Sequence, residues 1–204
     1  MSTTLVENEA ITGIAPLVLQ LKPAINLSDD ELLHFCRINR ELRIERNAQG
    51  ELIIMAPCGG DSSERESEII MQLRIWAKKD GTGTTFSSNG GFCLPNGAMR
   101  APDTSWVSYA RLNQFTAEER SKFLPICPEF VIELRSASDR LTDVQAKMQE
   151  YIANGARLGL LIDPAAKRVH IYRPNQAVEV LENPDVVSCN ELLPGFELIV
   201  SELW

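Results

Sequence analysis

Apolar residues recur with the 3.6-residue period of an amphipathic helix in two long stretches of the chain. The first stretch predicts a helix over residues 62–79 that ends at Asp80-Gly81, and the second predicts a helix over residues 141–153 that ends at Asn154-Gly155. The stripes consist of Ile69, Ile70, Leu73, Trp76 and Ala77 in the first helix and of Leu141, Val144, Met148, Tyr151 and Ile152 in the second. Each helix therefore has one face suited to packing against a core.

Two shorter helices are predicted from capping signals and polar composition. Ser28 is followed three residues later by Glu31, which is the capping-box signature, and opens a helix that runs through about Asn39. A polar stretch over about residues 116–122 also has helical character. The first of these helices precedes the longer amphipathic one along the chain.

Short apolar runs separated by turn residues predict strands in the rest of the chain. The clearest turns are Asn47-Ala-Gln-Gly50 and Pro164-Ala-Ala-Lys167, each of which joins two runs into a hairpin. The predicted strands cover residues 42–46, 51–56, 84–87, 92–94, 98–101, 103–107, 129–135, 158–163 and 168–173, followed by short strands and an apolar end at Leu203-Trp204.

The order of these elements predicts an α/β fold with a mixed sheet and some α+β character. A chain of 204 residues is long enough for one large domain, which we place over residues 28–204. Residues 1–27 are expected to form an extended, partly ordered leader. Because the start has no basic segment followed by an apolar one, we expect no signal peptide.

Composition argues against a membrane protein and a disulfide scaffold. No apolar run approaches the roughly 20 residues that span a membrane. The five cysteines are scattered singly, without a Cys-x-x-Cys pair, and predict free thiols in a reducing cytoplasm. The net charge of −8 weighs against a nucleic-acid partner. However, residues 176–204 hold six acidic residues and no Lys or Arg, so the balance over residues 1–175 is only −2.

Two carboxylates in predicted strands are the first candidates for chemistry. Asp103 follows Pro102 at the start of one strand, and Glu133 lies inside the apolar strand 129–135. A glutamate inside an apolar strand carries a desolvation cost that folding alone gives little reason to accept. If the two strands are neighbours, both carboxylates can converge on a hard divalent cation such as Mg²⁺. The structural alternative is that Asp103 caps a turn and Glu133 pairs with Arg135.

Two further charged residues lie on the predicted helices. The apolar stripe of helix 62–79, extended back by one turn, is centred on Glu66. This carboxylate either reaches a site or is stabilised at the helix start by the positive end of the helix dipole. Lys147 lies at the edge of the stripe of helix 141–153, beside Tyr151. It can extend over the carboxylates and stabilise negative charge on a phosphoryl group, or it can simply bury its aliphatic stem. Both residues thus have a functional and a structural interpretation.

An ordered set of motifs over about residues 28–204 resembles the Uma-type family of restriction endonucleases in the PD-(D/E)xK nuclease superfamily. The motifs are Ala-Pro-Asp103, Phe-Val-Ile-Glu133-Leu-Arg-Ser-Ala-Ser-Asp, Lys147-Met-Gln-Glu-Tyr151, Asn154-Gly-Ala-Arg-Leu-Gly and Leu-Ile-Asp163-Pro. The resemblance implies a restriction-endonuclease-like core preceded by an N-terminal helix and hairpin.

The resemblance also implies a Mg²⁺-dependent phosphodiesterase, with Asp103 and Glu133 as metal ligands and Mn²⁺ able to replace Mg²⁺. The lysine position of the motif, two residues after Glu133, is Arg135, which cannot act as a base near neutral pH but can hold phosphate. Lys147 on the following helix is then the candidate for the lysine's role. Glu66, where many relatives have His or Asn, would complete the metal or water shell.

We therefore predict a cytoplasmic, metal-dependent DNA endonuclease with no membrane partner. Nuclease folds of this kind often form homodimers to cut both strands, and the apolar Leu203-Trp204 end could support a dimer or pack on its own domain. One alternative, favoured by the acidic charge and by Arg135, is a catalytically inactive nuclease fold that serves as a binding or accessory module. A weaker alternative is a metal hydrolase of small phosphoesters.

Overall fold

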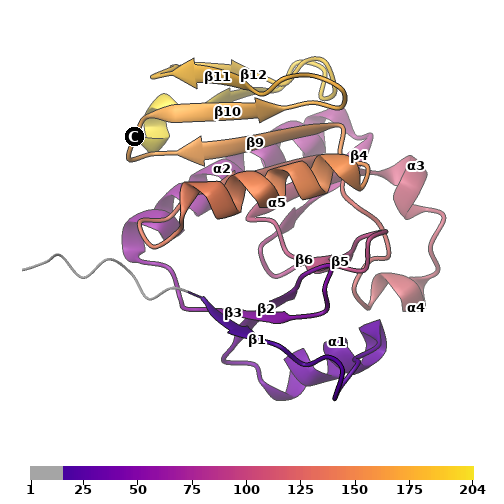
Figure 1. Cartoon of the computed structure of the whole chain (residues 1–204). Coiled ribbons are helices and arrows are strands. Elements are labelled where there is room, and N and C mark those ends of the chain that lie inside the picture. Colours follow the sequence, from indigo (N-terminus) through magenta and orange to yellow (C-terminus); the bar gives the residue numbers. More distant parts are fainter. Residues whose placement is uncertain (1–15) are drawn as a thin grey trace, which may run out of the picture.

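A six-stranded sheet forms the centre of the computed structural model, which describes residues 16–204 (Figure 1). Its strands are β4 (Gly83–Ser87), β7 (Thr104–Ser108), β8 (Phe130–Leu134), β9 (Leu158–Asp163), β10 (Arg168–Tyr172) and β11 (Glu179–Glu182). They lie in the order β11-β10-β9-β8-β7-β4, with β8 and β9 parallel and all other neighbours antiparallel. The predicted mixed sheet is therefore confirmed.

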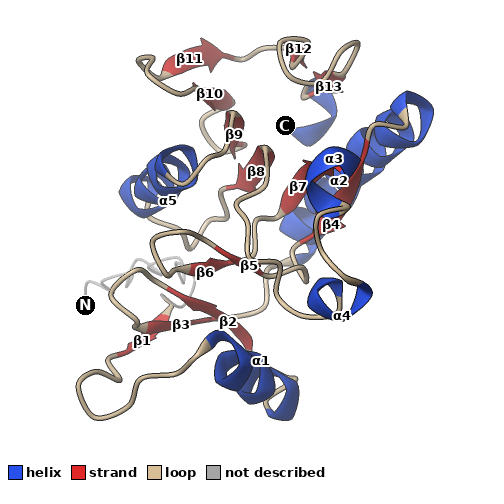
Figure 2. Cartoon of the chain, turned by 90° about the vertical axis from the view of Figure 1, so that its right-hand side faces the viewer, coloured by secondary structure: helices blue, strands red, loops and turns tan. Residues whose placement is uncertain are grey.

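Two helices cover opposite faces of this sheet (Figure 2). α2 (Gly60–Asp80) buries Ile69, Leu73 and Ala77 against one face. α5 (Leu141–Ala153) buries Met148 and Tyr151 against the other face. Because α5 connects the parallel strands β8 and β9, it is the crossover helix that such a pair requires. Both helices lie where the apolar stripes predict them.

The C-terminal segment packs on the same face as α2. It contains the strands β12 (Val186–Ser188) and β13 (Glu197–Ile199) and a short 3₁₀ helix, η1 (Ser201–Leu203). Leu203 is fully buried in this core, and the indole nitrogen of Trp204 donates to the carbonyl of Pro184 at 3.2 Å. The apolar end of the chain thus packs on its own domain.

A second, five-stranded antiparallel sheet lies beside the first and is covered by α1 (Asp29–Ile38) (Figure 1). Its strands are β1 (Leu17–Leu19), β2 (Arg43–Arg46), β3 (Leu52–Met55), β5 (Phe92–Cys93) and β6 (Met99–Arg100), in the order β1-β3-β2-β6-β5. The capping box at Ser28 is present as predicted. Residues 1–15 of the expected leader lie outside the described residues, whereas Leu17–Leu19 pair with β3.

The chain crosses from one sheet to the other, and this connection positions the site. β5 and β6 belong to the second sheet, although they lie between β4 and β7 of the first sheet along the chain. The segment after β6 therefore leads from one sheet directly into β7 of the other. Two short helices, α3 (Tyr109–Leu112) and α4 (Ala117–Arg120), connect β7 to β8. Only α4 was indicated by the sequence, through its polar helical stretch. Among residues 16–204, no helix is long and apolar enough to cross a membrane.

Candidate active site

Asp103 and Glu133 face each other across neighbouring strands. β7 and β8 pair in an antiparallel register in which Thr104 opposes Ile132, so the next position along the register brings Asp103 opposite Glu133. Oδ2 of Asp103 accepts a hydrogen bond from the backbone N–H of Leu134 at 2.8 Å. The condition on which the sequence argument depended, that the two strands are neighbours, is therefore met.

Glu133 is buried in β8 and has two other carboxylates, those of Asp103 and Glu45, near it. Its Oε1 accepts from the Tyr151 hydroxyl and contacts Nζ of Lys147, both at 2.9 Å. Burial raises the pKa of Glu133 to about 7, the charges of Asp103 and Glu45 add to this effect, and Lys147 opposes it. The single cation at Glu133, Lys147, therefore does not outweigh the effects of burial and of the neighbouring carboxylates.

Lys147 reaches from α5 to two carboxylates. Its Nζ lies 2.9 Å from an oxygen of Glu133 and 2.9 Å from Oε1 of Glu45. Burial acts to lower the pKa of Lys147, but the two carboxylates outweigh it and raise the pKa. The ammonium is consequently charged and bridges β8 of the core sheet with β2 of the second sheet.

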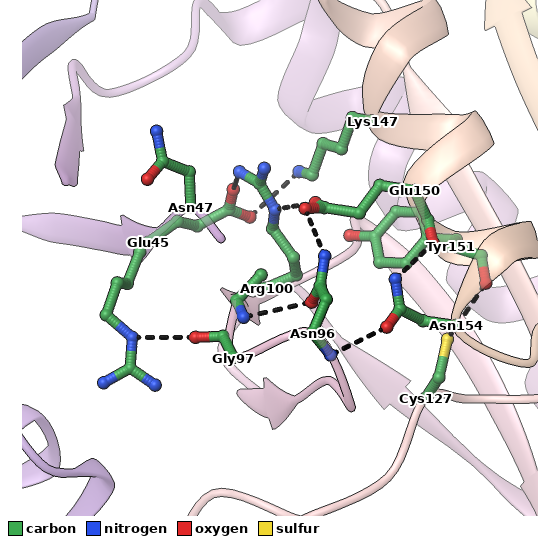
Figure 3. Close-up of polar contacts among 12 residues, drawn as sticks. Glu45, Asn47, Asn96, Gly97, Arg100, Cys127, Lys147, Glu150, Tyr151 and Asn154 are labelled. Carbon is green, nitrogen blue, oxygen red and sulfur yellow. Dashed lines mark hydrogen bonds and ion pairs between the residues drawn. The ribbon is translucent and has the colours of Figure 1, made fainter. Parts of the chain in front are cut away.

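Glu45 is a member of the site that the sequence argument did not find. It accepts from the backbone N–H of Ala101 at 3.0 Å. It also accepts from Nη1 of Arg100 at 3.0 Å, in addition to its contact with Lys147 (Figure 3). Burial acts to raise the pKa of Glu45, but the two cations and the Ala101 N–H overcome this and hold the pKa at about 2. Its strand, Arg43–Arg46, contains three charged residues and one apolar residue, as expected for an ordinary surface hairpin, so no sequence signal marks Glu45 as buried.

Arg100 connects this network to the next turn of α5. Its Nε donates to Glu150 at 2.6 Å while its Nη1 donates to Glu45 (Figure 3). Glu150 also accepts from the side-chain amide of Asn96 at 2.9 Å. The second sheet is thus connected to α5 by two charged contacts, one at Lys147 and one at Glu150.

The other two predicted residues lie at the margin of this cluster or outside it. Glu66 on α2 accepts from the Ser88 hydroxyl at 2.5 Å, and its charge contributes to raising the pKa of Arg43. Arg135 forms an ion pair with Asp163 at 2.8 Å and donates Nε to the carbonyl of Asp139 at 3.1 Å. The structure therefore brings Asp103, Glu133 and Lys147 together, while Arg135 contacts residues outside this cluster.

The donor set can be compared with what a divalent cation needs. The contacts join four acidic groups to three basic ones; the groups are Asp103, Glu133, Glu45 and Glu150 with Arg43, Lys147 and Arg100. Within residues 16–204, no group of three or more His, Cys, Asp or Glu side chains is arranged to hold a metal ion. Two carboxylate ligands fit a hard cation such as Mg²⁺, which keeps several waters in its shell.

Comparisons with known proteins agree with this architecture. A family model named Uma2 and described as "Putative restriction endonuclease" matches residues 29–201. A crystal structure from Anabaena variabilis, described as a "putative nuclease belonging to DUF820", is similar with 24% sequence identity and a TM-score of 0.68. The similarity covers 78% of this chain and 88% of that chain and confirms the fold. No curated protein matches the sequence.

Proposed function

This chain belongs to the Uma2 family of restriction-endonuclease-like proteins, and we propose that it is a metal-dependent endonuclease that hydrolyses phosphodiester bonds in DNA. The observation that carries the proposal is the position of Asp103 opposite Glu133 on neighbouring strands, with the ammonium of Lys147 2.9 Å from Glu133. Two carboxylates and a cation are the groups that metal-assisted phosphodiester hydrolysis requires.

Asp103 and Glu133 are the residues that would hold the cation, which we propose to be Mg²⁺, with Mn²⁺ able to substitute. Bound there, the cation would supply Lewis-acid polarisation of the phosphate and activation of a water molecule. The Leu134 N–H fixes one oxygen of Asp103, and the Tyr151 hydroxyl fixes one oxygen of Glu133. Both carboxylates are thereby oriented before any ligand arrives.

Lys147 would stabilise negative charge on the phosphate, since it is charged and fixed beside Glu133. Glu45 would act through Lys147 by fixing the position of its ammonium. Glu66 stays a candidate for the outer part of the metal or water shell. Arg135, held by Asp163, would have to leave that ion pair in order to contact phosphate.

A second function is favoured by one specific observation. The cation at the motif's lysine position, Arg135, is engaged by Asp163 and by a backbone carbonyl rather than by the site. This arrangement suits a nuclease fold that binds a partner without cutting. Such an accessory module would bind neither Mg²⁺ nor Mn²⁺ through Asp103 and Glu133.

The cellular setting and the assembly are further parts of the proposal. All five cysteines are free thiols, as expected for a protein of the reducing cytoplasm. A homodimer would place two sites on one duplex, but its interface must be sought away from Leu203, which is buried in its own core. Sedimentation analysis at micromolar concentration distinguishes a monomer from a dimer directly.

The test of function is cleavage of supercoiled plasmid in Mg²⁺ or Mn²⁺. Asp103→Ala should slow cleavage at least about a thousandfold, which corresponds to roughly 4 kcal/mol of barrier. Asp143→Ala is the matched control, because Asp143 is an exposed residue of the first turn of α5 and makes no contact with the site within the described residues. Cleavage by Asp103→Ala at the wild-type rate would exclude the proposed metal site.

A further inference from the structure

Arg43, at the start of β2, is a cation of the site to which the roles above assign nothing. Its Nη2 donates to Oδ1 of Asp103 at 3.0 Å. Because side chains alternate along a strand, Arg43 lies on the same face of β2 as Glu45. Its side chain is 33% exposed, compared with 16% for Asp103, so part of Arg43 is accessible from solvent.

One donor of Arg43 has no acceptor. Its Nε is buried and forms no hydrogen bond within the part of the chain that the structure describes. A buried donor left without a partner costs about 1–3 kcal/mol, and native proteins contain few of them. A guanidinium presents Nε–H and Nη–H side by side, in the geometry that binds two oxygens of one phosphate. Arg43 is therefore equipped to receive an oxyanion at this edge of the site.

The charges around Arg43 explain how the guanidinium could be released for a ligand. The guanidinium contacts Asp103 directly, and Asp103 is one of the two proposed metal ligands. With a divalent cation held by Asp103 and Glu133, the guanidinium of Arg43 would be repelled, would contact Asp103 less strongly, and would be free to donate to a phosphate attracted to the same place.

We propose that Arg43 is a substrate-binding residue, which donates its guanidinium N–H groups to oxygens of the phosphodiester held at the site. The inference rests on the proposed endonuclease function and extends it to the second sheet, because β2 would then contact substrate directly. The rival interpretation is that Arg43 only ties β2 to Asp103 and supports the metal ligand.

The experiment compares Arg43→Met with Arg40→Met. Arg40 is a suitable control because it is exposed, lies three residues earlier, and its Nε donates only to the carbonyl of Arg37. Three quantities are measured: plasmid cleavage in Mn²⁺, binding of a fluorescein-labelled random-sequence DNA duplex in Ca²⁺ by anisotropy, and binding of Mn²⁺ alone by calorimetry. Wild-type and Arg40→Met proteins should behave alike in all three.

For Arg43→Met we expect cleavage about a hundredfold slower, as for loss of a donor to a developing oxyanion. Duplex binding should weaken about tenfold, as for loss of a charge-assisted hydrogen bond. Mn²⁺ binding should stay unchanged or tighten, because Asp103 loses a competing cation. Loss of Mn²⁺ binding together with cleavage would overturn the inference in favour of the supporting role.

The outcomes separate this inference from the proposed function. If the wild type cuts plasmid and Arg43→Met does so equally well, the inference is wrong and the nuclease proposal stands. If the wild type binds the duplex through Arg43 without cutting, the contact is supported and the nuclease proposal fails. A wild type that neither cuts nor binds overturns both. Should Arg43→Met fail to fold, Arg43→Lys keeps the charge without the fork, and wild-type behaviour by that variant overturns the inference.

Discussion

Among the single residues of the site, Lys147 has a charge state that decides which chemistry is open to it. A lysine that abstracts a proton near neutral pH needs a lowered pKa. Here Glu133 and Glu45 each lie 2.9 Å from Nζ, and they raise the pKa of Lys147 against the effect of burial. Lys147 is therefore suited to hold phosphate charge, and in the proposed mechanism activation of water would be left to the carboxylates and a bound cation.

A second buried residue, His170, gives the protein a predictable response to acid. His170 lies on β10, and its Nε2 is buried without a hydrogen-bond partner among the described residues. Burial lowers its pKa below the usual value of about 6.5, Asp163 and Glu182 act to raise it, and Arg168 acts to lower it. The unfolded chain therefore takes up a proton at a higher pH than the folded protein does.

The sign of the effect on stability follows from this difference. At pH 7.5 both states hold a neutral His170, whereas at pH 5.5 the unfolded state binds more protons, and the free energy of unfolding falls. We expect that His170→Gln reduces the loss of stability between these two pH values, measured by urea unfolding. His34→Gln, which changes the exposed histidine of α1, is the control and should leave that loss as in the wild type. An equal loss in His170→Gln would contradict the account.

Strand β2 connects its own sheet to the candidate site. It pairs with β3 and β6, and it places Arg43 beside Asp103 and Glu45 beside Lys147. The N-terminal sheet therefore contributes residues to the candidate site and is not only attached to the nuclease core. The two contacts also connect β2 to the residue just before β7, Asp103, and to Lys147 of α5.

Replacing Glu45 tests this role of β2. Glu45→Ala would leave Lys147 and Arg100 without a shared carboxylate, and loss of one partner of a buried ion pair costs about 3–5 kcal/mol. We expect the free energy of unfolding in urea to fall by that amount and cleavage to slow, while Mn²⁺ still binds to Asp103 and Glu133. Glu41→Ala, at an exposed position just before β2, should change stability by less than about 0.5 kcal/mol. Equal stability of the two variants would refute the bridging role.

Elements with a strong periodic pattern could be predicted from the sequence, and contacts between distant segments could not. Helix α5 occupies residues 141–153 as predicted, because its apolar stripe and its Asn154-Gly155 end are both local signals. Glu133 was recognisable because apolar neighbours surround it in the chain. Glu45 is buried only through partners that lie 55 and 102 residues away, and Arg135 meets Asp163 28 residues away. Such pairings depend on strand order, which periodicity does not reveal.

At the scale of the whole molecule, the acidic charge lies in a favourable place for a DNA-binding protein. The net charge is −8, and six of the acidic residues lie in residues 176–204, a segment that contains no Lys or Arg of its own. Three of the six form ion pairs with Arg168 or Arg173, just outside the segment. Two of them, Glu179 and Glu182, are on β11, which is separated from β8 by β9 and β10. Three strand spacings amount to about 14 Å. This exceeds the Debye length of about 10 Å at 0.1 M salt, so repulsion between Glu179 or Glu182 and a phosphate at the site is largely screened.

Glu133, a buried glutamate of β8, is proposed to have a catalytic function, and the chain contains a matched control for it. Glu133 and Glu129 are equally buried, at 6% exposure, and lie four residues apart. Glu129 accepts from the backbone N–H and hydroxyl of Ser108, at 3.0 and 2.7 Å, and contacts neither Asp103 nor Lys147 within the described residues.

The most direct measurement is the rate of supercoiled-plasmid cleavage in Mn²⁺ by wild type, Glu133→Gln and Glu129→Gln, each shown to be folded by circular dichroism. Glu133→Gln should slow cleavage by about a thousandfold, equivalent to roughly 4 kcal/mol of barrier, while Glu129→Gln cuts at a rate close to wild type. Equal rates for the two variants, or no cleavage by the wild type, would contradict the account.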